Sequence, residues 1–187
     1  MNLKDKKVVV TGGSRGLGLG LVEACVEHGA KVTVVARDAD ALASVRTRLG
    51  VATISADVTD EAAAHRIMSE VQPDILVLNA GAKRMLWIMA KYANGVPAQN
   101  KLGIRFQAIV PQQMIGDTGV GDAGAKAYAR AMGIGRDEFL ARFGAPMPPR
   151  DFGEKVVSVL EDPKYAEGVV FGLKGDTGIT MLEGAAA

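Results

Sequence analysis

The stretch that decides the fold is TGGSRGLG, residues 11–18. It follows the short β-branched run KVVVT (7–11) and leads into a segment whose apolar residues recur at helical spacing. Gly12 permits a tight turn, and Gly16 and Gly18 let the backbone approach a phosphate and let the helix pack closely on its strand. The free amides and the positive end of that helix then face an anion. A glycine turn of this spacing, between a strand and a helix, predicts a nucleotide-phosphate site.

The rest of the chain alternates strand and helix. We expect strands at 7–11, 31–36, 51–56, 74–80, 104–110 and 168–173. We expect helices at 16–28, 39–49, 61–71, 82–94 and 151–161, with Asp38 capping the second and Thr59 or Asp60 the third. Strands that are apolar on both faces and separated by helices indicate a parallel sheet covered on both sides. The predicted fold class is therefore a doubly wound α/β fold.

Composition sets the broad class. The chain has 187 residues, of which 48% are hydrophobic, and this is typical of one soluble domain over 1–187. A net charge of +1 gives no field that would attract nucleic acid or an anionic membrane. The single Cys25 indicates a reducing compartment, and the first residues have no apolar stretch typical of a signal peptide, so we expect a cytoplasmic protein. No metal-ligand spacing is found, so we expect no metal.

Four pieces of the sequence together resemble the short-chain dehydrogenase/reductase family. Besides the glycine turn, ADVTD (56–60) is similar to an Asp-Val pair beside the adenine, LNAG (78–81) to the NNAG motif, and YAEG with LKG (165–175) to the closing segment. The resemblance covers nearly the whole chain. It implies a Rossmann fold, a nicotinamide cofactor, and hydride transfer to or from a small carbonyl or alcohol substrate. The cofactor-binding residues that it implies are Gly12, Ser14, Arg15, Gly16, Leu17, Gly18, Arg37, Asp57, Val58, Asn79, Ala80, Gly81 and Lys83.

Charge at the end of the second expected strand selects the cofactor. In the family, NAD-binding members carry an acidic residue there, and this chain has Ala36 in its place. Arg37 and Arg15 could both reach a 2′-phosphate, and the arginine fork suits phosphate. Asp38 comes one residue late and is sufficiently explained as a helix cap. The sequence therefore predicts NADP(H).

The catalytic residues of the family are represented by Lys83 alone. The family has a Ser on its fifth strand and then Tyr-x-x-x-Lys, but four residues before Lys83 stands Asn79, which already belongs to the LNAG motif. We interpret NAGAK as a junction from which one helix and the Ser-bearing strand are missing, so that six strands remain. Removing one such unit preserves a right-handed crossover. General acid–base assistance is typically worth about 10²–10⁴ in rate, so we expect very slow turnover at best. The alternative is a catalytically inactive NADP(H)-binding or regulatory relic.

Two segments carry further expectations. The 82–94 helix is apolar nearly all round, which favours self-association into a homo-oligomer. Residues 112–150 are expected to form a substrate lid, with Thr118 about two residues later than the threonine that contacts the cofactor in the family. His28 and His65 are expected on helices without a nearby carboxylate pattern, in surface or core roles.

An alternative function of another class, an aspartic protease, rests on the repeated GDTG at 116–119 and 175–178. Asp-Thr-Gly pairs mark aspartic proteases, in which two carboxylates, here Asp117 and Asp176, share a proton. The alternation of strands and helices argues against it, and Gly and Asp are ordinary turn residues. It remains a remote alternative.

Overall fold

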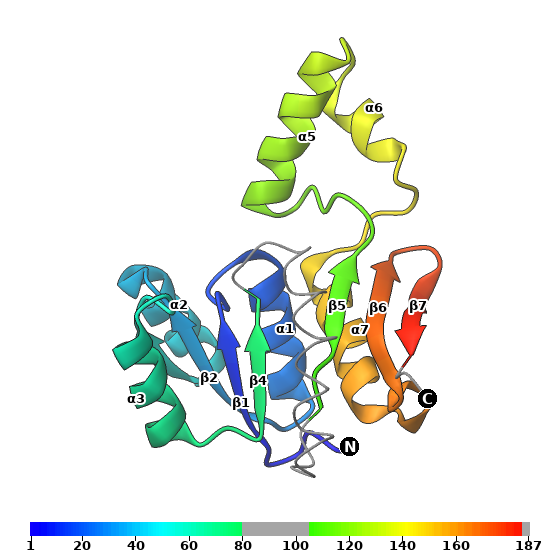
Figure 1. Ribbon diagram of the computed structural model, residues 1–187. Coiled ribbons are helices and arrows are strands. Elements are labelled where there is room, and N and C mark those ends of the chain that lie inside the picture. Colours follow the sequence, from blue (N-terminus) through cyan, green and yellow to red (C-terminus); the bar gives the residue numbers. More distant parts are fainter. Residues whose placement is uncertain (80–104, 185–187) are drawn as a thin grey trace. The chain divides into compact units, whose positions relative to one another are not determined.

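The computed structural model describes residues 1–79 and 105–184, which fall into two compact units (Figure 1). The first unit comprises residues 1–79, 117–119 and 148–161. The second comprises residues 105–116, 120–147 and 162–184. Each unit is described by itself. The assignment of 1–187 to a single domain stays a prediction.

The first unit contains a four-stranded parallel sheet in the order β3-β2-β1-β4. Its strands are β1 (Lys7–Thr11), β2 (Lys31–Ala36), β3 (Ala52–Ser55) and β4 (Ile75–Leu78). In register, Val10 of β1 lies opposite Val34 of β2 and Val77 of β4. Since all four strands run the same way, their carboxyl ends meet at one edge of the sheet (Figure 1). The parallel α/β fold expected from the sequence is confirmed for these strands.

Helices follow the strands where the sequence pattern predicts them. They are α1 (Gly16–Glu27), α2 (Ala39–Leu49), α3 (Glu61–Val71) and, from later in the chain, α7 (Pro149–Glu161). The carboxylate of Asp38 accepts a hydrogen bond from the Ala41 amide and caps α2, and that of Asp60 caps α3 in the same way. Asp60, rather than Thr59, is therefore the cap of the third helix.

Both faces of this sheet are covered, because alternate β1 residues point to opposite sides. On one face, Val9 and Val35 pack with Ile67 of α3 in a buried cluster. On the other face, Val10, Val34 and Val22 of α1 surround the site where a Cβ on Gly13 would stand, at 2.9–3.2 Å. This arrangement makes the sheet doubly wound, as the apolar runs of the strands predict.

The crossing of α1 with α7 is made possible by two glycines. A Cβ on Gly20 would lie 2.0 Å from the Pro149 carbonyl oxygen, and one on Gly153 would lie 2.3 Å from the Gly20 carbonyl oxygen. Real Cβ contacts of this kind do not occur, so the two backbones touch at this point. Cys25 is fully buried on α1, and burial, with help from Glu154 and Glu161, raises the pKa of its thiol to about 12.

The second unit contains a three-stranded sheet in the order β5-β6-β7. Strands β5 (Ala108–Pro111) and β6 (Gly168–Lys174) are parallel, and β7 (Gly178–Gly184) pairs antiparallel with β6. The unit also has the helices α5 (Gly119–Ala131) and α6 (Arg136–Ala141) and the 3₁₀ turn η1 (Pro163–Tyr165). Ala125 and Ala129 of α5 pack against Phe139 of α6 in a small buried cluster.

Four features of this unit differ from the expectations. Strands β5 and β6 form a separate, mixed sheet with β7, whereas all six expected strands were predicted in one parallel sheet. Strand β7 was not predicted, because the GDTG before it was interpreted only as a turn. Strand β5 starts at Ala108 rather than at 104 and includes Pro111, which a strand at the edge of a sheet tolerates. Residues 112–150, predicted to be loop with one or two short helices, contain the short α6 but also α5, which spans 13 residues.

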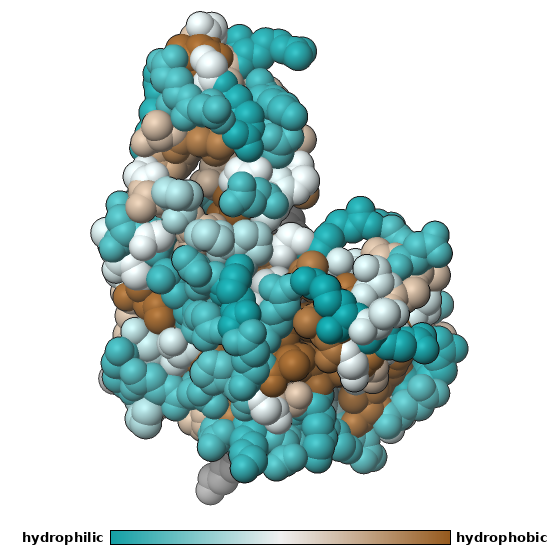
Figure 2. All heavy atoms as spheres, turned by 180° about the vertical axis from the view of Figure 1, so that it is seen from behind, coloured by the Kyte–Doolittle hydropathy of each residue, from teal (hydrophilic) through white to brown (hydrophobic). Residues whose placement is uncertain are grey.

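Hydrophilic side chains cover most of the face drawn in Figure 2, with hydrophobic side chains in separate patches between them. Across residues 1–79 and 105–184, no helix has the length and apolar character that crossing a membrane would require.

Candidate functional site

The glycine turn has the backbone geometry that its sequence predicts. Gly12 and Gly16 adopt φ values of 67° and 58°, in the left-handed region that glycine adopts without steric cost. Gly18 is buried, and a Cβ there would lie 2.3 Å from the Gly12 carbonyl oxygen and 2.6 Å from Asn79 Nδ2. The turn therefore folds back on the start of α1 too closely for any side chain at this position.

A set of hydrogen bonds joins the turn to the end of β4. The Thr11 hydroxyl donates to the Val77 carbonyl oxygen at 3.3 Å and accepts from the Asn79 amide at 3.2 Å. The Asn79 side chain donates through Nδ2 to the Gly12 carbonyl oxygen at 3.2 Å. Asn79 thus ties the ends of β1 and β4 together beside the glycine turn.

The amino end of α1 differs from those of the two helices that follow. In the described part of the chain, α2 and α3 are capped by aspartates, whereas the N-cap of α1 is Arg15, which makes no capping side-chain bond. The first turn of α1 also holds no acidic residue. The first amides of a helix need an acceptor, and an anion is the natural one. The glycine spacing predicts the turn, whereas the missing cap was not predicted.

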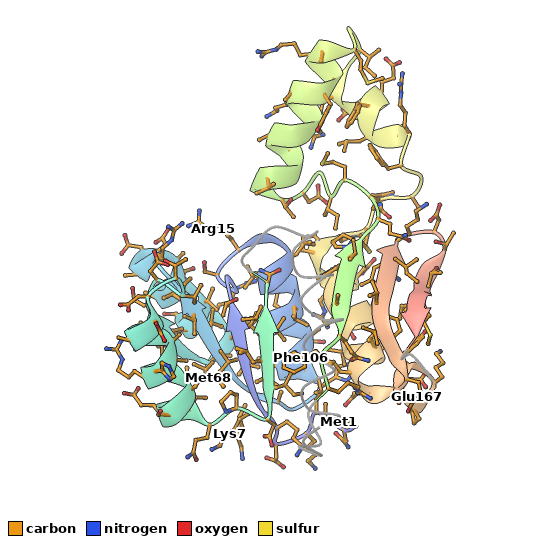
Figure 3. All side chains as sticks on the ribbon, in the orientation of Figure 1. Met1, Lys7, Arg15, Met68, Phe106 and Glu167 are labelled. Carbon is orange, nitrogen blue, oxygen red and sulfur yellow. The ribbon has the colours of Figure 1, made fainter. Side chains whose placement is uncertain are left out.

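The other predicted residues of this unit lie at the same edge of the sheet. Arg37 directly follows β2, and Asp57 and Val58 follow β3 by two and three residues. Figure 3 shows Arg15 at this carboxyl edge and Lys7 at the opposite end of the strands. Val58 is 36% exposed, so an apolar side chain is offered to solvent here.

Carboxylates accompany both arginines. Arg15 forms an ion pair through Nη2 with Asp38 Oδ2, and Arg37 Nη1 lies 4.0 Å from Asp57 Oδ2. The Ala41 amide, followed by Arg15, holds the pKa of Asp38 below its usual value. The backbone amide and hydroxyl of Thr59, followed by Arg37, lower the pKa of Asp57. Both aspartates are therefore charged at neutral pH.

The structure brings together most of the predicted cofactor residues. Those at or near the carboxyl edge of the first sheet are Gly12, Ser14, Arg15, Gly16, Leu17, Gly18, Arg37, Asp57, Val58 and Asn79. Ala80, Gly81, Lys83 and the 82–94 helix lie outside the described residues. The predictions about the catalytic Lys83 and about self-association through that helix therefore stay predictions.

Thr118, which comes about two residues later than the corresponding threonine of the family, lies at the glycine turn. A Cβ on Gly16 would stand 3.5 Å from Thr118 Cγ2, and residues 117–119 belong to the same compact unit as the glycine turn. Thr118 therefore packs against the glycine turn itself. Its spacing in the sequence gave no signal of this, because the contact joins residues about a hundred positions apart.

Asp117 and Asp176, the two aspartates of the protease alternative, both lie in turns. Asp117 precedes α5 in an exposed position, and Asp176 accepts a hydrogen bond from the Thr177 amide at 2.7 Å in the turn between β6 and β7. Within the described ranges, no three His, Cys, Asp or Glu side chains are grouped so that they could hold a metal ion.

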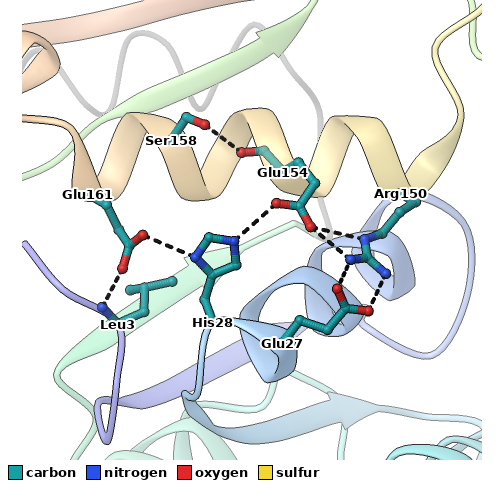
Figure 4. Close-up of polar contacts among 7 residues, drawn as sticks. All are labelled: Leu3, Glu27, His28, Arg150, Glu154, Ser158 and Glu161. Carbon is teal, nitrogen blue, oxygen red and sulfur yellow. Dashed lines mark hydrogen bonds and ion pairs between the residues drawn. The ribbon is translucent and has the colours of Figure 1, made fainter.

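The other end of α1 is tied to α7 by charged side chains (Figure 4). His28 Nδ1 lies 3.1 Å from Glu161 Oε2, and His28 Nε2 lies 3.1 Å from Glu154 Oε2. The expectation that His28 has no carboxylate neighbours is therefore wrong, since both come from more than 120 residues away. Arg150 of α7 also pairs with Glu27, and it donates from Nε to Glu154 at 3.1 Å.

Comparison with known proteins agrees with this geometry. A family model described as short chain dehydrogenase matches residues 6–94. A 3-dehydrosphinganine reductase of Arabidopsis thaliana is 41% identical over 86 residues, which are 42% of this chain and 26% of that protein. A rhamnolipids biosynthesis 3-oxoacyl-(acyl-carrier-protein) reductase of Pseudomonas aeruginosa is 40% identical over 89 residues, 43% of this chain and 35% of that protein. The chain thus spans about a quarter to a third of the length of these relatives.

Solved structures extend the likeness in fold. The structure of L-sorbose reductase from Gluconobacter frateurii, complexed with NADPH and L-sorbose, matches 97% of this chain and 99% of that one, with a TM-score of 0.69 at 19% identity. At this identity the likeness shows the fold alone. Residues 6–94, which include the glycine turn and the ends of the four parallel strands, match the short-chain dehydrogenase/reductase family, so the match covers less of the chain than the motifs predict.

Proposed function

We propose that this chain binds NADP(H) at the carboxyl edge of the β3-β2-β1-β4 sheet and belongs to an oxidoreductase acting on a small carbonyl or alcohol. The observation that carries the proposal is the uncapped amino end of α1 behind a turn in which no Cβ fits at Gly18. A bound nicotinamide cofactor would supply or accept the hydride. The residues of this chain would hold its phosphates and its adenosine.

The phosphates would be held by backbone rather than by side chains. The left-handed Gly12 and Gly16 shape the turn, and the first amides of α1 provide donors with the positive end of the helix dipole behind them. Asn79 keeps the turn in place by its bond to the Gly12 carbonyl oxygen. Thr118 packs over the turn at Gly16. These features support the binding of a diphosphate at the glycine turn.

The adenosine end supports NADP(H) over NAD(H). Strand β2 ends at Ala36, where an acidic residue would accept hydrogen bonds from the ribose hydroxyls, and Arg37 follows it. Arg15 and Arg37 would pair with the 2′-phosphate, while Asp57 and Val58 would lie beside the adenine. We draw no substrate from the relatives, because their similarity covers only 42–43% of this chain.

The catalytic centre is proposed to be incomplete. Lys83 would touch the nicotinamide ribose, but the family's Ser and Tyr have no counterpart at the positions where the sequence pattern expects them. We attribute this to the loss of one helix–strand unit between the LNAG motif and Lys83, within a single domain whose lid is 112–150. The second candidate function is binding of NADP(H) without turnover, which the same loss favours.

The cofactor assignment is tested by titrating NADPH and NADH into the wild-type chain and into Arg37→Asp. An arginine–phosphate hydrogen bond contributes about 1.5–3 kcal/mol, so NADPH should bind roughly ten- to a hundredfold more tightly than NADH. Arg37→Asp should abolish or invert that preference. Arg66→Asp, which reverses an exposed charge on α3, is the matched control and should preserve it. Equal affinities in the wild type would refute the assignment.

The two candidate functions are separated by a single-turnover experiment. NADPH-loaded protein is mixed with a panel of ketones, and oxidation is followed by absorbance. Tight binding with no oxidation supports binding of NADP(H) without turnover, whereas slow oxidation supports an oxidoreductase with an incomplete catalytic centre. Tyr128 is an exposed tyrosine of α5 and a candidate replacement proton donor. Robust turnover that disappears in Tyr128→Phe would show that the chain has another proton donor and that the incomplete centre was wrongly inferred.

A further inference from the structure

The two arginines on which the proposed 2′-phosphate site depends are already engaged by carboxylates. Arg15 pairs with Asp38, and Arg37 approaches Asp57 at 4.0 Å. All four side chains belong to the same compact unit. A phosphate arriving at this edge would therefore meet negative charge as well as positive charge.

Asp38 uses its two oxygens for two separate tasks. Oδ1 accepts the capping hydrogen bond from the Ala41 amide at 3.0 Å, and Oδ2 pairs with Arg15 Nη2. The cap belongs to the folding of α2, whereas the ion pair does not. Because the tasks fall on different atoms, one can be removed without the other.

The ion pair holds Arg15 only loosely. The Arg15 side chain is 71% exposed and touches Asp38 through one nitrogen, whereas a phosphate can engage the guanidinium fork with two parallel bonds. Such a contact neutralises the arginine but does little to orient it. This asymmetry favours competition between Asp38 and phosphate over a role for Asp38 in positioning Arg15.

We propose that Asp38 is an internal competitor of the cofactor 2′-phosphate for Arg15, and that it weakens the preference of this chain for NADP(H). The inference rests on the proposed function, because it needs a 2′-phosphate at this edge. In the free protein, Asp38 neutralises Arg15. On binding, the phosphate must take the guanidinium from the carboxylate or share it at the cost of repulsion between the two anions.

The test is calorimetric titration with adenosine 2′,5′-bisphosphate and with 5′-AMP, which differ only in the 2′-phosphate. Asp38→Asn keeps the cap, because asparagine caps helices as well as aspartate, and it removes the competing charge. We expect this variant to bind the bisphosphate about three- to fivefold more tightly at low salt, with 5′-AMP unchanged. The gain should shrink as ionic strength rises. Asp38→Ser, which also caps, is the second variant should the first fold poorly.

Two further variants separate competition from a general effect of charge. Asp40→Asn removes the same charge from an exposed position in the first turn of α2 and should leave both affinities unchanged. In an Arg15→Gln background, Asp38→Asn should give no gain, because the contested partner is absent. A gain that survives without Arg15 overturns the inference.

The remaining outcomes distinguish this inference from the proposed function. If the wild type prefers the bisphosphate and Asp38→Asn leaves or weakens that preference, the inference fails and the cofactor assignment stands. If neither protein distinguishes the two nucleotides, the cofactor assignment itself fails. If only Asp38→Asn prefers the bisphosphate, the competition is confirmed and is strong enough to mask Arg15 in the wild type.

Discussion

The two ends of helix α1 are built in opposite ways. At its amino end the chain turns through glycines, and the N-cap Arg15 makes no capping side-chain bond to the helix amides. At its carboxyl end His28 lies between Glu154 and Glu161 of α7, each at 3.1 Å. The Glu161 carboxylate also accepts a hydrogen bond from the Leu3 amide at 2.6 Å. We call the amino end of α1 the open end, because it presents backbone groups, and the carboxyl end the tied end, because its side chains bind those of α7.

At the tied end, the polar side chains make several hydrogen bonds and ion pairs with one another. Both contacts of His28 are hydrogen bonds only when both ring nitrogens carry a proton, since a neutral imidazole has a single N–H. Next to it, Glu27 pairs with Arg150, which also donates to Glu154. A shallow hollow lined by Met1, Asn2, His28 and Glu161 lies at this end of the helix and not at the glycine turn.

This difference indicates how one helix can serve both folding and binding. Contacts with α7 hold α1 along its length, through the backbone crossing at Gly20 and through the tie at His28. Its amino end then needs no cap of its own to stay in place. Amides held in position by the rest of the fold are prepared for a ligand, and such preorganisation lowers the cost of binding.

The largest expected effect on stability comes from disrupting the backbone contact between α1 and α7 at Gly20, in the middle of α1. In Gly20→Ala the new Cβ would stand 2.0 Å from the Pro149 carbonyl oxygen, so the backbones of α1 and α7 must separate. We expect the free energy of unfolding to fall by about 3 kcal/mol and the melting temperature by about 6–12 °C. Differential scanning calorimetry measures both.

Gly119→Ala is the control for that change. Nothing lies within 4 Å of a Cβ there, and its φ is not in the left-handed region. It should leave the melting temperature within about 1 °C of the wild type. Similar melting temperatures for Gly20→Ala and this control would show that the two helices are not in backbone contact.

A smaller and more local effect comes from breaking the open end alone. In Gly18→Ala the Cβ would meet the Gly12 carbonyl oxygen at 2.3 Å and Asn79 Nδ2 at 2.6 Å, so the turn must open. We expect NADPH affinity to fall by roughly thirtyfold, about 2 kcal/mol, as followed by fluorescence titration.

His28→Ala, at the tied end, is the control for Gly18→Ala, because it should change stability without changing cofactor affinity. It removes both contacts to α7 and should lower the melting temperature while leaving NADPH affinity within about twofold. If both variants lost affinity equally, the two ends of α1 would not be functionally separate, and the comparison would have to be abandoned.

The open end of α1 was largely predictable from sequence, because its determinants are local. TGGSRGLG specifies its own left-handed turns, and Asp38 and Asp60 cap helices three residues away or fewer. Strand β1 and helix α2 occupy the residues expected of them, since their apolar periods are complete within each segment. Local patterns of this kind need no knowledge of tertiary structure.

The tied end was not predictable, because its partners are distant in sequence. His28 meets carboxylates more than 120 residues later, and no pattern around His28 announces them. The same holds for Thr118 at Gly16 and for the backbone crossing of Gly20 with Gly153, each a contact between segments far apart in the chain. Strand β7 was missed for another reason, since the GDTG turn before it was interpreted as the end of the last strand rather than as the turn of a β-hairpin.

The smallest expected effect concerns the contribution of the Glu27–Arg150 ion pair at the tied end to the stability of the protein. Hydrogen bonds from Arg150 lower the pKa of Glu27 below its ordinary value of 4.5. A group whose pKa is lower in the folded state stabilises the protein above its unfolded pKa, and this stabilisation is lost as pH falls through the folded pKa. Glu27→Gln should therefore lower the melting temperature at pH 7, by about 1–2 °C because the pair is exposed.

The pH dependence separates charge from packing at this end of the helix. Below about pH 4.5 the difference between the wild type and Glu27→Gln should shrink towards zero, because acid protonates the wild-type carboxylate as well. Salt should reduce the difference at pH 7 for the same reason. Glu70→Gln, an exposed glutamate of α3, should show no such convergence. A difference that persists unchanged at pH 3 would mean that Glu27 holds α1 to α7 through the packing of its side chain, and that the tied end depends on shape more than on charge.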